Sequence, residues 1–189
     1  MSTVRSALLV NTTELTRQPG TQRHLELSVP LADVDIDDPR LTGAVEVDVT
    51  LVSTIDDIVV TGHLAVPWSD ECRRCLTPLA ETLVVDVDER YAEEDPTGRR
   101  RVDPEAFPIE HGQIDLAPMV RSEVLLAVPD APLCRADCAG LCPTCGVDLN
   151  AGPCDCETEA RDDRWAALDQ LRSQSGQDPL RNEPSDPVE

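Results

Sequence analysis

The sequence contains no lysine, and its basic residues are few. All 16 basic residues are arginine, against 37 acidic residues, which gives a formal net charge of −21. A chain this acidic has no general attraction to phosphate backbones or anionic lipids. Nucleic acid could be held only by a local arginine patch, whereas a basic protein partner needs no such patch.

Aromatic residues make up only 2% of the chain, although hydrophobic residues as a whole make up 40%. We therefore expect a core built mainly from valine, leucine, isoleucine and alanine. No stretch is apolar over the roughly 18 residues that a membrane-spanning helix needs. The N-terminus lacks a basic segment followed by an apolar run and a cleavage site. The sequence thus predicts a cytoplasmic protein with no membrane partner.

Motifs of the common enzyme classes are also missing. The chain has no G-x-S-x-G, P-loop, H-E-x-x-H or dinucleotide fingerprint, so no motif indicates catalysis or a small-molecule substrate. His24, His63 and His111 are interpreted as surface or core residues. The pairs Asp37-Asp38 and Asp56-Asp57 are typical of turns.

Alternating apolar and polar residues predict an antiparallel sheet. Residues 7–20 indicate a short strand and a turn, and the alternation is clear in four longer segments, at 22–30, 44–54, 58–68 and 81–92. The last three follow one another through tight connections, which is typical of a meander with one buried face. The sequence does not decide whether such a sheet stays open or curls into a partly closed barrel.

The fold class predicted is α+β, with one helix covering the sheet. Residues 92–113 are rich in proline and glycine and indicate a mobile loop. The helix is expected at 115–128, capped by Asp115, with Pro118 in its first turn. Its predicted apolar stripe consists of Leu116, Met119, Val120, Glu123 and Ala127.

Three regions are expected along the chain. Residues 1–133 form the β-rich body with its covering helix, and residues 134–173 form a cysteine-rich zinc module with a short terminal helix. That helix would carry Trp165, Leu168 and Leu171 on one side. Residues 174–189 have the composition of a disordered acidic tail.

The eight cysteines carry the strongest chemical signal. In a reducing compartment, closely paired cysteines are more often metal ligands than disulfides. Structural zinc takes four tetrahedral ligands and prefers thiolates. Gly146 follows a cysteine pair directly and suits the positive φ that such a turn needs. The cysteines are Cys72, Cys75, Cys134, Cys138, Cys142, Cys145, Cys154 and Cys156.

We expect two zinc ions. The first site would consist of Cys72, Cys75, Cys134 and Cys138, and the second of Cys142, Cys145, Cys154 and Cys156. Exchange of pairs between the sites stays open, as does replacement of one thiolate by Asp137, Asp155 or His111. An iron–sulfur cluster uses the same ligands.

A redox role for Cys72 and Cys75, as in a thiol-disulfide oxidoreductase, is a further alternative. That chemistry places the pair at a helix N-terminus, whereas this pair lies in a predicted strand-to-strand turn. Two arginines, Arg73 and Arg74, lie between these cysteines. Together with Arg99, Arg100 and Arg101 they could contact RNA phosphate or a partner, although solvated loop arginines explain them equally well.

The order of these parts resembles the YceD family, the bacterial and plastid large ribosomal RNA subunit accumulation proteins. The likeness rests on the strand meander that leads into Cys72-Arg73-Arg74-Cys75-Leu76, and on three later segments. Those segments are 114–116 with 123–129 in the helix, the run from Cys138 to Asn150 that contains Gly140-Leu141-Cys142-Pro143-Thr144-Cys145-Gly146, and Cys154-Asp155-Cys156.

The resemblance implies a non-enzymatic role in making, processing or stabilising 23S ribosomal RNA, with no catalytic residue. It also supports metal binding at Cys72, Cys75, Cys142 and Cys145. The partners it implies are a large-subunit precursor, its RNA or a basic ribosomal protein. Because the chain is so acidic, a chaperone for a basic large-subunit ribosomal protein is the alternative reading of this role.

Overall fold

The computed structural model describes residues 7–93 and 105–156. The predictions for Arg99, Arg100 and Arg101, for the terminal helix with Trp165 and for the acidic tail lie outside the described residues. The chain divides into two compact units, Met1–Cys138 and Ala139–Glu189. No helix of the described residues is long and apolar enough to cross a bilayer.

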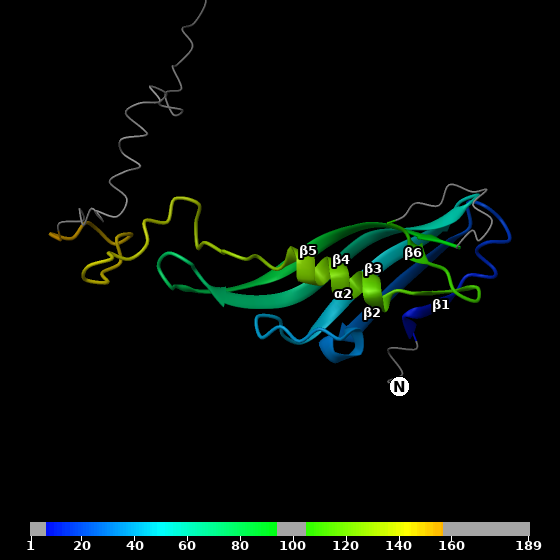
Figure 1. Ribbon diagram of the computed structural model, residues 1–189, viewed down its shortest axis with the longest axis horizontal. Coiled ribbons are helices and arrows are strands. Elements are labelled where there is room, and N and C mark those ends of the chain that lie inside the picture. The colour runs from blue at the N-terminus through cyan, green and yellow to red at the C-terminus, as the bar shows by residue number, and fades with distance from the viewer. Residues whose placement is uncertain (1–6, 94–104, 157–189) are drawn as a thin grey trace, which may run out of the picture. The chain divides into compact units, whose positions relative to one another are not determined.

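The first unit is built on a five-stranded sheet with strand order β2-β3-β4-β5-β6 (Figure 1). β2 to β5 pair antiparallel, and β6 is parallel to β5. The period-two alternation therefore predicted the four long strands correctly. Their bounds are Gln22–Pro30 for β2, Ala44–Ser53 for β3, Asp57–Glu71 for β4, Pro78–Ala92 for β5 and Phe107–Pro108 for β6.

The sheet is open over the residues that the structure describes, with β2 at one edge and β6 at the other. Closure into a barrel requires the first and last strands to pair, and β2 and β6 do not pair in the described part of the chain. One face of the sheet is buried under an aliphatic core, as the composition predicted. The side chains of Val45, Val47, Val49 and Leu51 on β3 and of Ile58, Val60, Leu64 and Val66 on β4 are at most 1% exposed.

Gly62 lies at the centre of β4, opposite Val49 of β3. Its φ is 151°, and a Cβ atom at this position would lie 2.2 Å from the carbonyl oxygen of Asp48. Only glycine allows the two strand backbones to approach this closely. The residue is thus a steric requirement of the β3–β4 pairing.

Helix α2, Ala117–Ala127, lies across the buried face of the sheet (Figure 1). The N-cap residue is Leu116 and not the predicted Asp115, although the Asp115 carboxylate accepts a hydrogen bond of 2.9 Å from the Ala117 N–H. The predicted stripe is partly wrong, because Val124 is fully buried while Glu123 is only half-buried. Positions 120, 124 and 128 share one helical face, and the valines at those positions contact the core.

Two short strands replace part of the loop predicted at 92–113. β6 pairs with Tyr91 and Ala92, and the rings of Tyr91 and Phe107 stack with their centroids 5.2 Å apart. β7, Gln113–Asp115, pairs with β1, Leu9–Asn11. The prediction of a loop is wrong at these residues because pairs of two or three residues show no periodicity.

Candidate metal centres

The first cysteine pair lies in the turn between β4 and β5. The Cys72 N–H donates to the Thr77 carbonyl at 2.9 Å, and the Leu76 N–H donates to the Cys72 carbonyl at 2.9 Å. Leu76 closes this turn with a φ of 60°. The two bonds fold Cys72 and Cys75 toward the same point, as expected for a pair of ligands.

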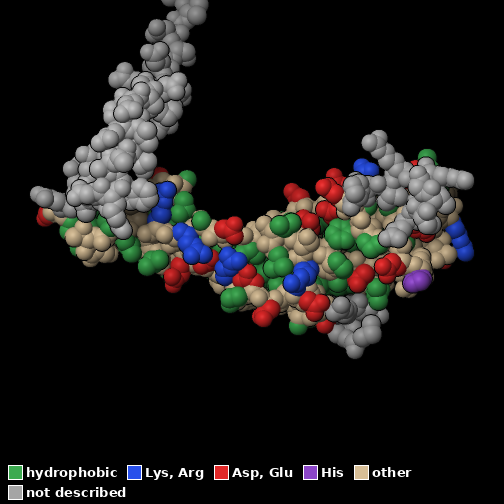
Figure 2. Space-filling model, viewed as in Figure 1, with side chains coloured by type: hydrophobic (Ala, Val, Ile, Leu, Met, Phe, Trp, Pro, Cys, Tyr) green, Lys and Arg blue, Asp and Glu red, His purple; other side chains and the backbone are tan. Residues whose placement is uncertain are grey.

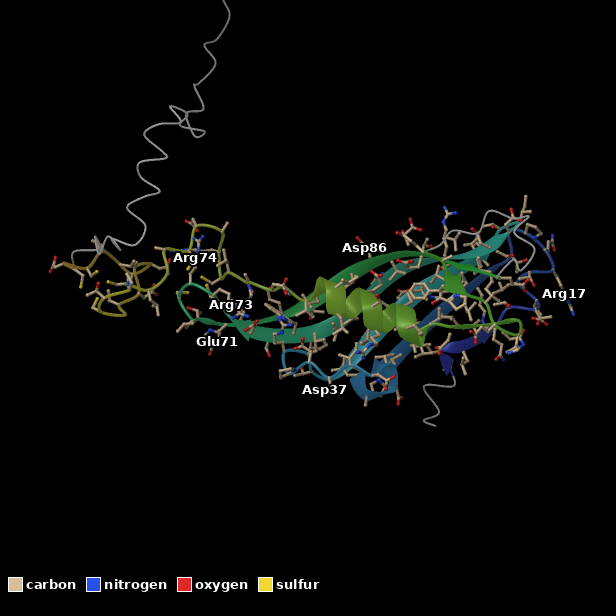
Figure 3. All side chains as sticks on the ribbon, viewed as in Figure 1. Arg17, Asp37, Glu71, Arg73, Arg74 and Asp86 are labelled. Carbon is tan, nitrogen blue, oxygen red and sulfur yellow. The ribbon has the colours of Figure 1, made fainter. Side chains whose placement is uncertain are left out.

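A second segment reaches this turn from the end of α2. The Arg73 N–H donates to the Pro132 carbonyl at 2.9 Å, which holds the chain that carries Cys134 and Cys138 against the turn. The Arg74 guanidinium donates to the Cys138 carbonyl at 2.8 Å. Figure 3 shows the Arg73 and Arg74 side chains at this end of the sheet. Arg74 thus has an internal contact, and its predicted role in partner binding remains a prediction.

The four sulfurs at this turn have the spacing of a tetrahedral metal site. The Sγ atoms of Cys72 and Cys138 are 3.8 Å apart, and those of Cys75 and Cys134 are 3.6 Å apart. All four lie within 4.8 Å of one another. A zinc–sulfur bond of about 2.3 Å and a tetrahedral angle place two sulfurs about 3.8 Å apart. The group could therefore hold one tetrahedral ion.

The second unit contains a turn of the same kind. The Cys142 N–H donates to the Val147 carbonyl at 2.8 Å, and the Gly146 N–H donates to the Cys142 carbonyl at 2.9 Å. Gly146 has a φ of 74°, as the sequence predicted. The Sγ atoms of Cys142, Cys145, Cys154 and Cys156 again lie within 4.8 Å of one another.

Asn150 and Asp148 support this second turn. The Asn150 side-chain oxygen accepts from the Ala139 N–H at 2.8 Å, and the Asn150 amide donates to the Asp148 carboxylate at 2.7 Å. Sequence reasoning used these two residues only as part of a family pattern. Their spacing, with an acid two residues before an asparagine, is a turn signal that would have identified them.

The thiols of each group differ in their readiness to ionise. A hydrogen bond from the Cys134 backbone N–H is the main cause that lowers the pKa of Cys72 to about 6. The Cys145 backbone N–H is the main cause that lowers the pKa of Cys142 to about 6. Desolvation among the other sulfurs raises the pKa of Cys134 to about 12, and a hydrogen bond with Cys145 raises that of Cys156 to about 12.

The raised pKa values of Cys134 and Cys156 disfavour four thiolates together in either group at neutral pH without a cation. A divalent metal bound there would supply that charge and displace the remaining protons. The structure forms the two groups of four cysteines set out from the sequence, and neither includes Asp137, Asp155 or His111. Metal binding by these cysteines stays a prediction.

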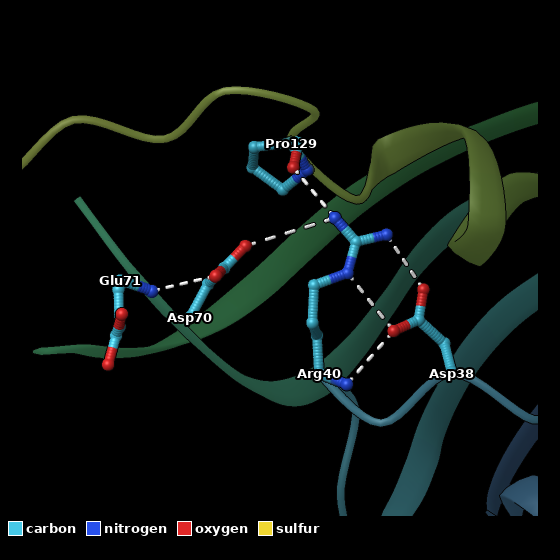
Figure 4. A network of polar contacts seen from close by, with 5 residues as sticks. All are labelled: Asp38, Arg40, Asp70, Glu71 and Pro129. Carbon is cyan, nitrogen blue, oxygen red and sulfur yellow. Dashed lines mark hydrogen bonds and ion pairs between the residues drawn. The ribbon is translucent and has the colours of Figure 1, made fainter. Parts of the chain in front are cut away.

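A polar network around Arg40 joins the loop before β3 to β4 and to the chain that follows α2 (Figure 4). The guanidinium donates to both carboxylate oxygens of Asp38, at 3.0 and 2.8 Å, and to the Pro129 carbonyl at 3.0 Å. It also lies 3.9 Å from the Asp70 carboxylate near the end of β4. Sequence reasoning assigned Asp38 only to a turn and missed this network.

Known proteins resemble this chain over most of its length. The chain is 33% identical over 187 residues to an uncharacterized protein of Mycobacterium tuberculosis, and the aligned region covers 95% of this chain and 88% of the relative. It is 32% identical over 154 residues to an uncharacterized protein of Mycobacterium leprae, and that aligned region covers 78% of this chain and 70% of the relative. No solved structure matches the chain.

Two further comparisons match this chain to large ribosomal RNA subunit accumulation proteins. The chain is 38% identical over 77 residues to the large ribosomal RNA subunit accumulation protein YCED homolog 1, chloroplastic, of Arabidopsis thaliana, over 40% of this chain and 24% of that protein. Residues 60–172 match the family model described as large ribosomal RNA subunit accumulation protein YceD. This match spans more than half of the sequence and includes every cysteine of both groups, so the chain belongs to the YceD family.

Proposed function

We propose that the chain is a non-enzymatic assembly factor of the large ribosomal subunit, which supports the synthesis, processing or stability of 23S ribosomal RNA. Its membership of the YceD family supports this role. The structural observation that carries it is the pair of cysteine groups. Both groups fix exposed turns that a partner can contact, and neither turn resembles a catalytic centre.

Each cysteine group holds one structural zinc ion under this proposal. Four thiolates at tetrahedral spacing are a preferred donor set for zinc. The second group lies in a segment with few buried side chains, so metal coordination supplies order that burial does not. An iron–sulfur cluster would use the same sulfurs, and absorbance in the visible region distinguishes it from zinc.

The partner that fits the charge is a basic ribosomal protein. At −21 the chain repels RNA over most of its surface but attracts a lysine- and arginine-rich protein. In this scheme the chain shields such a protein before assembly, and its effect on 23S ribosomal RNA is indirect. A direct contact between Arg73 and RNA phosphate is the competing scheme.

A redox role for Cys72 and Cys75 is the second candidate, and the lowered pKa of Cys72 favours it. A reactive cysteine must also be reached by its substrate. The Cys72 side chain is 0% exposed, and its sulfur lies among three others. The lowered pKa therefore serves a metal ligand better than a redox nucleophile.

Co-purification from cell lysate tests the assembly role. The tagged full-length protein is isolated under reducing, chelator-free conditions at increasing salt, with and without nuclease. We expect a large-subunit ribosomal protein to remain bound after nuclease treatment and to leave as salt rises. Loss of every partner on nuclease treatment would favour the RNA scheme.

A genetic measurement complements this experiment. We expect cells that lack the protein to show a lowered ratio of 23S to 16S ribosomal RNA. An unchanged ratio, together with no ribosomal component in the co-purification, would contradict the proposed function.

A further inference from the structure

Strand β5 has a neighbouring strand on only one side for most of its length. Its pairs with β4 run from Pro78 to Ala92, whereas β6 pairs only with Tyr91 and Ala92. In the described parts of the chain, no strand lies beside the outer edge of β5 from Pro78 to Arg90. Alternate N–H and C=O groups of an edge strand point outward and can pair with another chain.

The C-terminal end of this edge already accepts an added segment. β6 pairs there in parallel, and the Ile109 N–H donates to the Ala92 carbonyl at 2.9 Å. The backbone of β5 is therefore accessible to strand pairing from the outer side. A further segment placed in line with β6 would pair with the rest of the edge.

The charge along this edge is mostly negative. Asp86 and Asp88 point to the open face of the sheet and are exposed, and Glu89 lies on the face that α2 covers. Figure 3 labels Asp86 on β5, and Figure 2 shows acidic side chains along the upper margin of the sheet, where β5 runs in Figure 1. Arg90 is the one basic residue of β5, and its guanidinium is paired with Asp57 at 3.4 Å.

Acidic side chains gather at two places beside this edge. An open hollow of about 180 Å³ is lined by Asp88, Glu89, Arg90, Glu105 and Ala106. Burial and the Glu89 carboxyl raise the pKa of Glu123 on α2, because these two carboxyls lie together. Arginine or lysine side chains on the two faces of an added strand would pair with the carboxylates at these two places.

The occupant follows from this pattern. Natural sheet edges often carry charges that prevent pairing between copies of one chain, and the acidic side chains here would repel a second acidic edge. They would also repel RNA phosphate. A positively charged segment instead gains hydrogen bonds from the backbone and ion pairs from alternate side chains.

We infer that the outer edge of β5 binds an extended, arginine- and lysine-rich polypeptide segment as an added strand. This inference rests on the proposed function, because a basic ribosomal protein is what supplies such a segment. It adds the place of contact and the mode of binding.

A synthetic peptide tests the mode of binding on the full-length, zinc-loaded protein. The probe is a fluorescein-labelled peptide of about ten residues that alternates arginine and valine, a length typical of one long strand. We expect anisotropy to report binding, and hydrogen exchange to slow at the amides of β5 but not at those of β2. The same peptide with alternate amides N-methylated lacks half of its donors and is expected to bind about tenfold more weakly or worse.

Matched variants test the place of contact. Asp86→Asn with Asp88→Asn is expected to weaken peptide binding about tenfold. The control, Glu26→Gln with Glu46→Gln, removes two charges from the same exposed face on β2 and β3, and is expected to change binding less than about twofold. Equal losses in both variants, or unchanged exchange at β5, would overturn the inference. So would a single-stranded RNA oligonucleotide that protects the same β5 amides.

The lysate experiment separates this inference from the proposed function. If the wild-type chain retains a ribosomal protein and the Asp86→Asn/Asp88→Asn variant loses it, both are supported. If both chains retain it equally, the inference fails and the proposed function stands. If the wild-type chain retains no ribosomal component while the peptide still binds at β5, the proposed function fails and the edge site stands.

Discussion

Leu76 and Gly146 occupy the same position in two turns with the same backbone hydrogen bonds. Each residue follows the second cysteine of a pair and donates its N–H to the carbonyl of the first cysteine at 2.9 Å. Both have positive φ, 60° at Leu76 and 74° at Gly146. Glycine adopts this conformation freely, whereas leucine does so at a cost of about 1–2 kcal/mol.

Leu76→Gly is therefore expected to stabilise the metal-loaded first turn. The Leu76 side chain is 55% exposed, so little buried surface is lost. Relief of backbone strain is offset in part by greater freedom of the unfolded chain, which leaves a gain of up to about 1 kcal/mol. Gly146→Leu should have the opposite sign. Chelator competition measures both, and a weaker metal affinity in Leu76→Gly would contradict the argument.

Metal content checks the two sites separately. We expect two zinc ions per chain in the protein as isolated, and one ion in each of the variants Cys72→Ser and Cys142→Ser. Elemental analysis with a visible spectrum makes the measurement. One ion in the wild-type chain, or loss of both in a single variant, would contradict independent sites.

Gly62→Ala is expected to destabilise the sheet by about 3 kcal/mol or more, because the new Cβ would strike the β3 backbone and the φ would be strained. Denaturant unfolding measures the loss. Thr61→Ala is the matched control, since Thr61 is exposed on the same strand. A loss of less than about 1 kcal/mol would show that β3 and β4 can move apart to admit the Cβ atom with little effect on the free energy of unfolding.

Glu123 should make the free energy of unfolding depend on pH. Burial first, and then the Glu89 carboxyl, raise its pKa from the ordinary value of 4.5. Because the folded pKa exceeds the unfolded one, the ionised form weakens the fold at pH 7, and this penalty disappears as the pH falls through the folded pKa. Glu123→Gln should thus raise the free energy of unfolding at pH 7 by about 0.5 kcal/mol.

The gain from Glu123→Gln should decrease as the pH falls from neutral toward 4.5. Unfolding measured across that range provides the check. Glu26→Gln, on an exposed strand position, is the control. A gain that stayed constant down to acid pH would show that the effect does not arise from ionisation.

Arg40→Ala is expected to cost about 2–3 kcal/mol, because it leaves Asp38 and Asp70 without their cation and the Pro129 carbonyl without its donor. Arg40→Lys keeps the charge but not the fork of two bonds to Asp38, and should recover only part of the loss. Thermal unfolding of both variants measures the difference. Full recovery by lysine would show that charge alone matters.

The sequence predicted those parts of the fold that repeat along the chain. Alternation in 44–54 and 81–92 located two strands because each spans many residues and buries one face. β6 and β7 were not predicted, because strands of two or three residues are too short to show alternation and form only where a partner strand lies beside them. The helix was expected, but the sequence did not show that Val124 would be more deeply buried than Glu123. That difference depends on which side of the helix packs against the sheet.

The candidate sites show the same division. The cysteine spacing indicated two groups of four, because a structural zinc ion takes four tetrahedral ligands. Leu76 gave no signal, because nothing local marks a leucine for positive φ. The edge of β5 was also hidden, because strand order decides which strand lacks a neighbour and the sequence shows only which residues alternate.

The cysteines of the first group come from two segments that lie far apart in the sequence. Cys75 and Cys134 are 59 positions apart, and Cys72 and Cys138 are 66 apart. An ion bound there would act as a cross-link around a long loop that contains β5 and α2, and closing such a loop removes much entropy from the unfolded chain. The second group closes only residues 142–156. Release of the first ion should therefore loosen the whole first unit, whereas release of the second should melt one local turn.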